Sequence, residues 1–140
     1  MPAPDPVIAV VREWLRKADH DLTAAAHVLT LGEDCPTDTV CFHAQQCVEK
    51  HLKALLVLRS TPFPRTHDLG ALLVLLPAKV RPKLDESTRN RLTAYATVTR
   101  YPGAGLDIPL AEARKAVAVA RRIRREVRKR LPKAALRKKK

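Results

Sequence analysis

The stretch CFHAQQCVEKHLKALL, residues 41–56, decides the fold class of this chain. Its apolar residues recur at steps of three and four, which is the period of an amphipathic α-helix. The apolar side continues in both directions and consists of Val40, Ala44, Val48, Leu52, Leu55 and Leu58. The pattern predicts a helix from about Pro36 to Arg59, and His51 falls on its apolar side.

The opposite side of this helix carries four polar residues that differ from a generic charged surface. They are His43, Gln46, Lys50 and Lys53, which we call the polar stripe. An imidazole, an amide and two ammonium groups suit a phosphate, or the acidic and backbone groups of a partner. The other interpretation is an ordinary solvated helix face, and spacing alone favours it.

A metal site on the same helix is a third interpretation. His43, Cys47 and His51 are four residues apart, so neighbours in the series could share a ligand. Successive members turn by about 40° around the helix, and three ligands in a line surround a tetrahedral ion poorly. A buried cysteine and a core histidine are therefore preferred, and we expect no metal and no other cofactor.

Prolines separate four more helical patterns along the chain. The first runs from Val7 to Leu31, with Asp5 as its cap and Gly32 at its end. The others are a short helix over residues 69–76 capped by Thr66 or Asp68, one from near Pro82 to Val98, and one from Pro109 to Leu131. The last has an inner face of Ala113, Ala116, Ala120, Ile123, Val127 and Leu131. No segment alternates with period two, so the sequence predicts an all-α, up-and-down antiparallel bundle of four to five helices.

Composition excludes several classes of protein. Four glycines in 140 residues argue against a barrel, a Rossmann fold or a phosphate-cradling loop. No apolar run approaches the ~18 residues of a membrane span, and the first residues lack the pattern of a signal peptide. Three cysteines without CxxC spacing fit a reducing compartment. We expect a cytoplasmic protein with no membrane partner.

The positive charge is concentrated at the C-terminal end. The net charge is +13, and 14 of the 27 Lys and Arg but only 2 of the 14 acidic residues lie from Glu112 onward. The predicted outer rows of the last helix are Arg121, Arg122, Arg125, Arg128 and Lys129. Such a surface attracts nucleic-acid phosphates without reading bases. The alternative is a solubilising tail. We expect a domain over residues 5–131 and a basic, disordered tail over residues 132–140.

Four segments, in this order and spacing, resemble the HEPN domain family. They are DLTAAAHVL (21–29), CFHAQQCVEKHLKALLV (41–57), PRTHDLGALL (64–73) and TRYPG (99–103). The resemblance, to a branch of small prokaryotic proteins marked by HAQQ, RTHDL and RYP, implies a helical bundle that usually dimerises. It also implies nucleotide or RNA binding and a minimal nucleotidyltransferase partner in a toxin–antitoxin-like unit.

Many relatives in this family are metal-independent endoribonucleases, and that activity rests on an Arg followed by a His after four to six residues. No such pair occurs here, so the resemblance leaves enzymatic activity open. The weak catalytic candidates are His43, His67 and Arg100, because an imidazole can move protons and a guanidinium can hold a phosphate. The alternative interpretation of His67 is that it caps and anchors the third helix. The ligand-binding candidates add Arg65 and Tyr101 to Arg100 and the polar stripe. The remaining alternative is a non-catalytic interaction module.

A homodimer is expected from apolar residues that the predicted core does not use. Phe42, Leu56 and Val57 lie on the polar side of the second helix and need cover, which a partner chain would supply.

Overall fold

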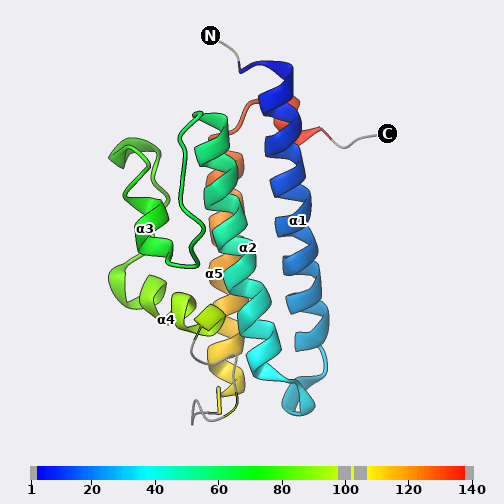
Figure 1. Ribbon diagram of the computed structural model, residues 1–140. Helices are drawn as coiled ribbons and strands as arrows, with labels where there is room; N and C mark the ends of the chain where they lie inside the picture. The colour runs from blue at the N-terminus through cyan, green and yellow to red at the C-terminus, as the bar shows by residue number, and fades with distance from the viewer. Residues whose placement is uncertain (1–2, 98–101, 103–106, 138–140) are drawn as a thin grey trace.

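The computed structural model describes residues 3–97, 102 and 107–137, and every described regular element is helical (Figure 1). The α-helices are α1 (Asp5–Leu29), α2 (Thr37–Leu58), α3 (Leu69–Leu73), α4 (Glu86–Thr97), α5 (Leu110–Arg128) and α6 (Lys133–Leu136). Two short 3₁₀ turns are η1 (Gly32–Asp34) and η2 (Ala78–Val80). The predicted all-α helical bundle is confirmed.

Three long helices form the body of the molecule, and α2 lies between α1 and α5 (Figure 1). The short helices α3 and α4 pack beside α2. After α2 the chain returns along the bundle through residues 59–68, so that α2 and α5 run in the same direction and α1 runs opposite to both (Figure 1). The topology thus differs from a strict up-and-down order at this one connection.

The core contains most of the predicted apolar residues of the second and last helices, although Leu58 is only half-buried. All six predicted inner residues of the last helix are buried, and four of them are alanines or the small Val127. These small side chains let α5 approach α2 closely, where Leu52, Leu56 and Ile123 are fully buried. Leu56 corrects the sequence argument for a dimer, because its own chain already covers it. Phe42 and Val57 are half-buried.

The helices begin and end where local capping hydrogen bonds and backbone conformation place them, and several of these positions differ from the predicted boundaries. Asp5 is the first residue of α1, with no side-chain cap, and so is not the expected capping residue. Gly32 follows α1 with a φ of 66°, a left-handed conformation that glycine adopts without strain. Asp68 caps α3 by accepting a hydrogen bond from the backbone N–H of Ala71 at 3.2 Å. The fourth helix begins at Glu86, after Asp85 accepts the N–H of Thr88 at 2.7 Å.

The basic end is more ordered than the sequence suggested. The last long helix, α5, ends at Arg128 and not at the predicted Pro132, which is instead the residue before α6 (Lys133–Leu136). Ala135 is buried, and α6 packs on α1. Arg12 also donates a hydrogen bond to the carbonyl of Arg137 at 3.0 Å. The expected disordered tail is therefore wrong for the residues up to Arg137.

No helix in the described parts of the chain combines the length and apolar character that a membrane crossing requires.

Candidate anion-binding site

The polar stripe of α2 is not one surface, because its members have different partners. His43 and Lys50 both bind Asp21 of α1, with Nδ1 of His43 2.8 Å from Oδ1 and Nζ of Lys50 2.5 Å from Oδ2. Asp21 is 8% exposed, so this carboxylate joins α1 to α2 inside the packed interface. The His43 ring is thus held to Asp21 through its Nδ1 atom. His43 and Lys50 keep part of their surface in solvent.

Lys53 corrects the expected stripe most clearly, because it is buried rather than solvated. Its exposed fraction is 9%, and its ammonium group bonds Oε2 of Glu49 at 3.0 Å. The same ammonium group lies 5.4 Å from the ring centre of Trp14 and 5.6 Å from that of Phe63. These contacts offset the desolvation of the charge through a counter-charge and two aromatic faces. Lys53 is thus a core residue and not a ligand-binding group.

Glu49 is the centre of a second buried polar network. Its Oε1 lies 2.8 Å from Nδ1 of His67 and accepts a hydrogen bond from the amide of Gln45 at 3.1 Å. The Gln45 amide also reaches the carbonyl of His67 at 3.3 Å. Gln46 donates to Oε1 of Gln45 at 2.7 Å, so it extends this network outward. His67 anchors the start of α3 to α2, as the sequence alternative held, while Asp68 provides the cap.

The other members of the predicted metal series have structural partners. His51 is fully buried, and its Nδ1 lies 2.7 Å from the carbonyl of Cys47. Burial lowers the pKa of His51, because the charged imidazolium is penalised away from water. Burial likewise raises the pKa of the Cys47 thiol. The described residues contain no group of three His, Cys, Asp or Glu arranged to hold a metal ion.

The remaining predicted ligand residues are Arg65, Arg100 and Tyr101. Arg65 is exposed in the segment before α3. Arg100 and Tyr101 lie outside the described residues.

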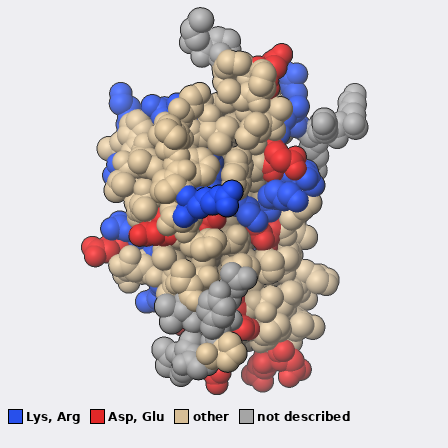
Figure 2. All heavy atoms as spheres, viewed as in Figure 1, with Lys and Arg blue, Asp and Glu red and all other residues tan. Residues whose placement is uncertain are grey.

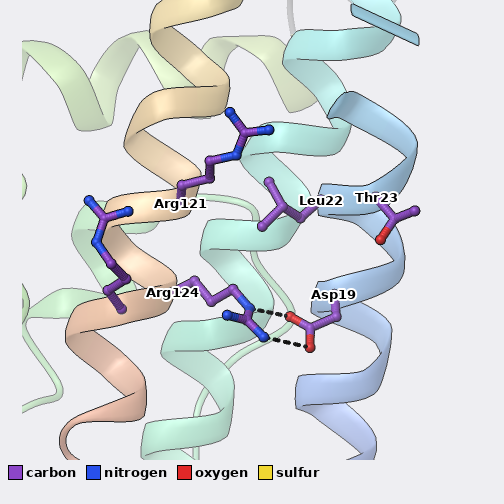
Figure 3. A pocket seen from close by; sticks show the side chains of 6 residues that line it. Asp19, Leu22, Thr23, Arg121 and Arg124 are labelled. Carbon is purple, nitrogen blue, oxygen red and sulfur yellow. Dashed lines mark hydrogen bonds and ion pairs between the residues drawn. The ribbon is translucent and has the colours of Figure 1, made fainter. Parts of the chain in front are cut away.

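A groove between α1 and α5 gathers the cations instead (Figure 3). The cavity has a volume of about 440 Å³. Its walls are Asp19, Leu22 and Thr23 from α1, and Arg121, Arg124 and Arg125 from α5. Figure 3 shows Arg124 reaching across to Asp19 on the facing helix. The volume is within the range of small-ligand sites, although the lining is more polar than is usual for them, since Leu22 is its one apolar residue.

One of the three arginines is already engaged. Nε of Arg124 donates to Oδ1 of Asp19 at 2.8 Å, and Nη2 lies 3.4 Å from Oδ2. This hydrogen bond raises the pKa of Arg124, whose guanidinium is charged in any case. Both side chains are a little over one-third exposed, at 35% for Arg124 and 38% for Asp19.

The other two arginines are available to a ligand. Arg121 and Arg125 are exposed, and neither side chain has a hydrogen-bond or ion-pair partner among the described residues. They are one turn apart on α5, about 6 Å along the helix axis. Guanidinium groups bind phosphate oxygens bidentately, and Thr23 adds a hydroxyl on the facing wall. The groove can therefore hold a phosphate-bearing ligand without a metal ion.

The sequence predicted only part of this site. Arg121 and Arg125 belong to the predicted basic patch, but Arg122 is directed elsewhere, with its Nη1 2.7 Å from both the Lys83 carbonyl and Glu126. Arg128 is half-buried and Lys129 is exposed on α5, and neither lines the groove. The residues that the sequence missed are Asp19, Leu22, Thr23 and Arg124. A usable signal existed, since Asp19 follows the buried Ala18 and Arg124 follows the buried Ile123. Opposite charges that border two apolar faces can pair across a helix interface.

A smaller cavity of about 270 Å³ lies between α4 and α5. Its carboxylate, Glu112, already accepts a hydrogen bond from the hydroxyl of Tyr95 at 2.5 Å. Arg91 lies 3.9 Å from the same carboxylate. This cavity therefore contains an acidic group that is already paired, and it is smaller than the groove.

Comparison with known proteins identifies the relatives of this fold. The family model of the HEPN domain matches residues 11–130. The crystal structure of TT1696 from Thermus thermophilus is similar with a TM-score of 0.71 and 32% identity, over 86% of this chain and 98% of that one. The structure of ST0689, an archaeal HEPN homologue, is similar with a TM-score of 0.65 and 26% identity, over 86% and 96% of the two chains. Among curated proteins, no sequence gives a significant match.

Proposed function

We propose that this chain, which belongs to the HEPN domain family, binds a nucleotide or a nucleic-acid strand through its phosphates in the groove between α1 and α5. The observation that carries the proposal is the pair Arg121 and Arg125, two exposed and unpaired cations one turn apart over a cavity of about 440 Å³. Leu22 supplies an apolar wall for a base or sugar. The concentration of positive charge from Glu112 onward attracts such ligands from a distance.

The test compares two double variants that remove the same charge. Arg121→Ala/Arg125→Ala removes the free cations of the groove. Arg59→Ala/Lys79→Ala removes two exposed cations that lie outside it. Fluorescence anisotropy with a short labelled RNA and with a labelled ATP analogue measures affinity at low salt.

The groove variant is expected to lose about tenfold or more in affinity, because a hydrogen bond to a charged group contributes about 1.5–3 kcal/mol. The control variant is expected to lose much less. Equal losses of affinity in both variants would mean that binding depends only on the net charge of the chain, and the proposed site would be wrong.

A minimal nucleotidyltransferase partner and a homodimer are further proposals that the family resemblance supports. The face viewed in Figure 1 has large uncharged areas between small groups of charged residues (Figure 2). Phe42 and Val57 of α2 remain half-buried in the single chain. Light scattering of the purified chain, alone and after co-expression with a minimal nucleotidyltransferase, tests both. A monomer that stays unbound in the mixture would contradict them.

Ribonuclease activity is the competing proposal. His43 and His67 each have Nδ1 held by a carboxylate, an arrangement that can orient an imidazole for proton transfer. They belong to separate networks, on Asp21 and on Glu49. An assay on structured and unstructured RNA with a chelator present tests this alternative. Cleavage that His43→Gln and His67→Gln abolish would favour an enzyme over a binding protein.

A further inference from the structure

Asp19 is the one acidic side chain among the six that line the groove. It lies on the wall that would face a bound phosphate, because Thr23 is one turn further along the same helix. It also occupies Arg124 through two oxygen atoms, at 2.8 and 3.4 Å. A site that needed only positive charge would be stronger without this residue.

We infer that Asp19 is a specificity-determining residue, an internal anion that selects ligands with two or more linked phosphates over ligands with a single phosphate. The inference rests on the proposed function of the groove and names its ligand class. Asp19 sets this selectivity by competing for Arg124 and by repelling an incoming anion.

The selectivity between single and linked phosphates follows from the number of free cations in the groove. With Arg124 engaged by Asp19, the free donors of the groove are Arg121 and Arg125. A single phosphate must either displace the carboxylate from Arg124 or bind beside it, and both are opposed by the negative charge of Asp19. Two linked phosphates carry more negative charge and meet more repulsion, but they can contact Arg121 and Arg125 at the same time, and these two charge-assisted contacts offset it.

Because Asp19 and Arg124 are partly exposed, a ligand phosphate can compete with Asp19 for Arg124. At 38% and 35% exposure the Asp19–Arg124 pair is screened by solvent, and such pairs are weak enough for a ligand to replace. A fully buried pair would be fixed, as the Glu49–Lys53 pair is, with exposed fractions of 3% and 11% for the two side chains. The Asp19–Arg124 pair can therefore open when a ligand binds, and it is not part of the core.

The test uses Asp19→Asn, which keeps the size of the side chain and one acceptor oxygen while removing its charge. The matched control is Glu126→Gln, which removes the same charge from α5 at a residue that pairs with Arg122 outside the groove. Isothermal titration calorimetry at low ionic strength uses orthophosphate and tripolyphosphate as probes. Circular dichroism checks that each variant is folded.

The unmodified chain is expected to bind tripolyphosphate more tightly than orthophosphate. Asp19→Asn is expected to raise the affinity for orthophosphate by about tenfold and that for tripolyphosphate by less, so the ratio between the two probes falls. Glu126→Gln is expected to leave the ratio unchanged.

The two proposals fail in different ways. If Asp19→Asn weakens both probes, or changes the ratio no more than Glu126→Gln does, Asp19 only positions Arg124 and the inference is wrong, while binding to the groove stands. If the unmodified chain binds neither probe nor RNA and Asp19→Asn does not restore binding, both proposals are wrong. If Asp19→Asn alone gains binding, the competing role of Asp19 is supported and the function proposed for the natural groove is not.

Discussion

Glu49 Oε1 and His67 Nδ1 lie 2.8 Å apart, although one residue is in the middle of α2 and the other precedes α3. The same carboxylate neutralises Lys53 through its second oxygen, at 3.0 Å. Glu49 thus fastens the returning segment after α2 to the bundle and also compensates a buried cation. Both roles depend on one carboxylate, which is 3% exposed. The stability of the fold therefore depends strongly on the charge of Glu49.

Removing this charge is expected to destabilise the chain strongly. Glu49→Gln leaves the ammonium group of Lys53 buried without a counter-charge, and breaking a buried pair in this way typically costs about 3–5 kcal/mol. Urea unfolding followed by circular dichroism measures the loss. Glu13→Gln, at an exposed pair with Arg16, is the matched control and is expected to change the free energy of unfolding far less. Similar losses in the two variants would contradict the buried network.

Two aspartates on α1 are expected to differ in their effect on stability. Asp21 is 8% exposed and compensates both His43 and Lys50, whereas Asp19 has a partner at the edge of the groove. Asp21→Asn is expected to lower the free energy of unfolding by about 2–3 kcal/mol. Asp19→Asn is expected to stay within about 1 kcal/mol of the parent. Thermal unfolding of the two variants, which differ by two positions, measures this contrast, and a reversed order would refute it.

His51 is expected to make stability depend on pH. Burial lowers its pKa below the ordinary 6.5, so the folded chain keeps this imidazole neutral while the unfolded chain binds a proton below about pH 6.5. The free energy of unfolding should therefore fall as the pH drops from 6.5 toward the lowered pKa, by up to about 1.4 kcal/mol per pH unit from this group. Above pH 6.5 this contribution is fully present.

Urea titrations at several pH values measure that slope. His51→Gln removes the titrating group and is expected to flatten the acid side of the profile, whatever its effect at neutral pH. His27→Gln, at an exposed position of α1, controls for the introduction of an amide. Identical slopes for both variants would exclude His51 as the source.

The cysteines are expected to resist thiol reagents in the folded chain. Burial raises the pKa of Cys41 to about 12 and also raises that of Cys47, so little thiolate exists near pH 8. Cys35 is 8% exposed and is the most accessible of the three. Reaction with Ellman's reagent should be slow in buffer and complete for three thiols in urea. Rapid labelling that persists in a Cys35→Ser variant would contradict this expectation.

Nucleic-acid binding is expected to weaken with salt. Each phosphate contact on a single strand contributes a slope of about −0.7 to the log–log dependence of affinity on salt. Arg121→Ala/Arg125→Ala should make the slope shallower by about 1.4, if each arginine contacts one phosphate. Anisotropy titrations from low to moderate salt measure it. An unchanged slope would place the phosphate contacts elsewhere on the chain.

The sequence predicted the fold well where apolar periodicity alone determines the structure. The inner faces of the second and last helices were read directly from steps of three and four, because burial follows the helix period over twenty residues or more. Short elements were predicted less accurately. The fourth helix begins at Glu86 and not near Pro82, since the cap at Asp85 decides its start.

The candidate site could be predicted only in part, because helix periodicity gives a direction and not a partner. Lys53 lies opposite the apolar face of α2, yet Trp14 and Phe63 from other segments cover it. Likewise, Arg124 and Asp19 each border an apolar face, but the sequence does not specify that these two residues, 105 positions apart, are partners. Those contacts arise from the packing of α1 against α2 and α5 and from the returning segment, which a single helical wheel does not contain.

The docking of α6 on α1 has a practical consequence for handling the molecule. Arg12, near the start of α1, donates a hydrogen bond to the carbonyl of Arg137, which follows α6, so the first and last described segments lie at one pole of the bundle (Figure 1). A fluorophore, an affinity tag or a fused second protein attached at either end would therefore leave from the same pole. Joining the two ends by a short peptide and opening the chain in the exposed turn around Glu33 would give a circularly permuted protein with the same three-helix body.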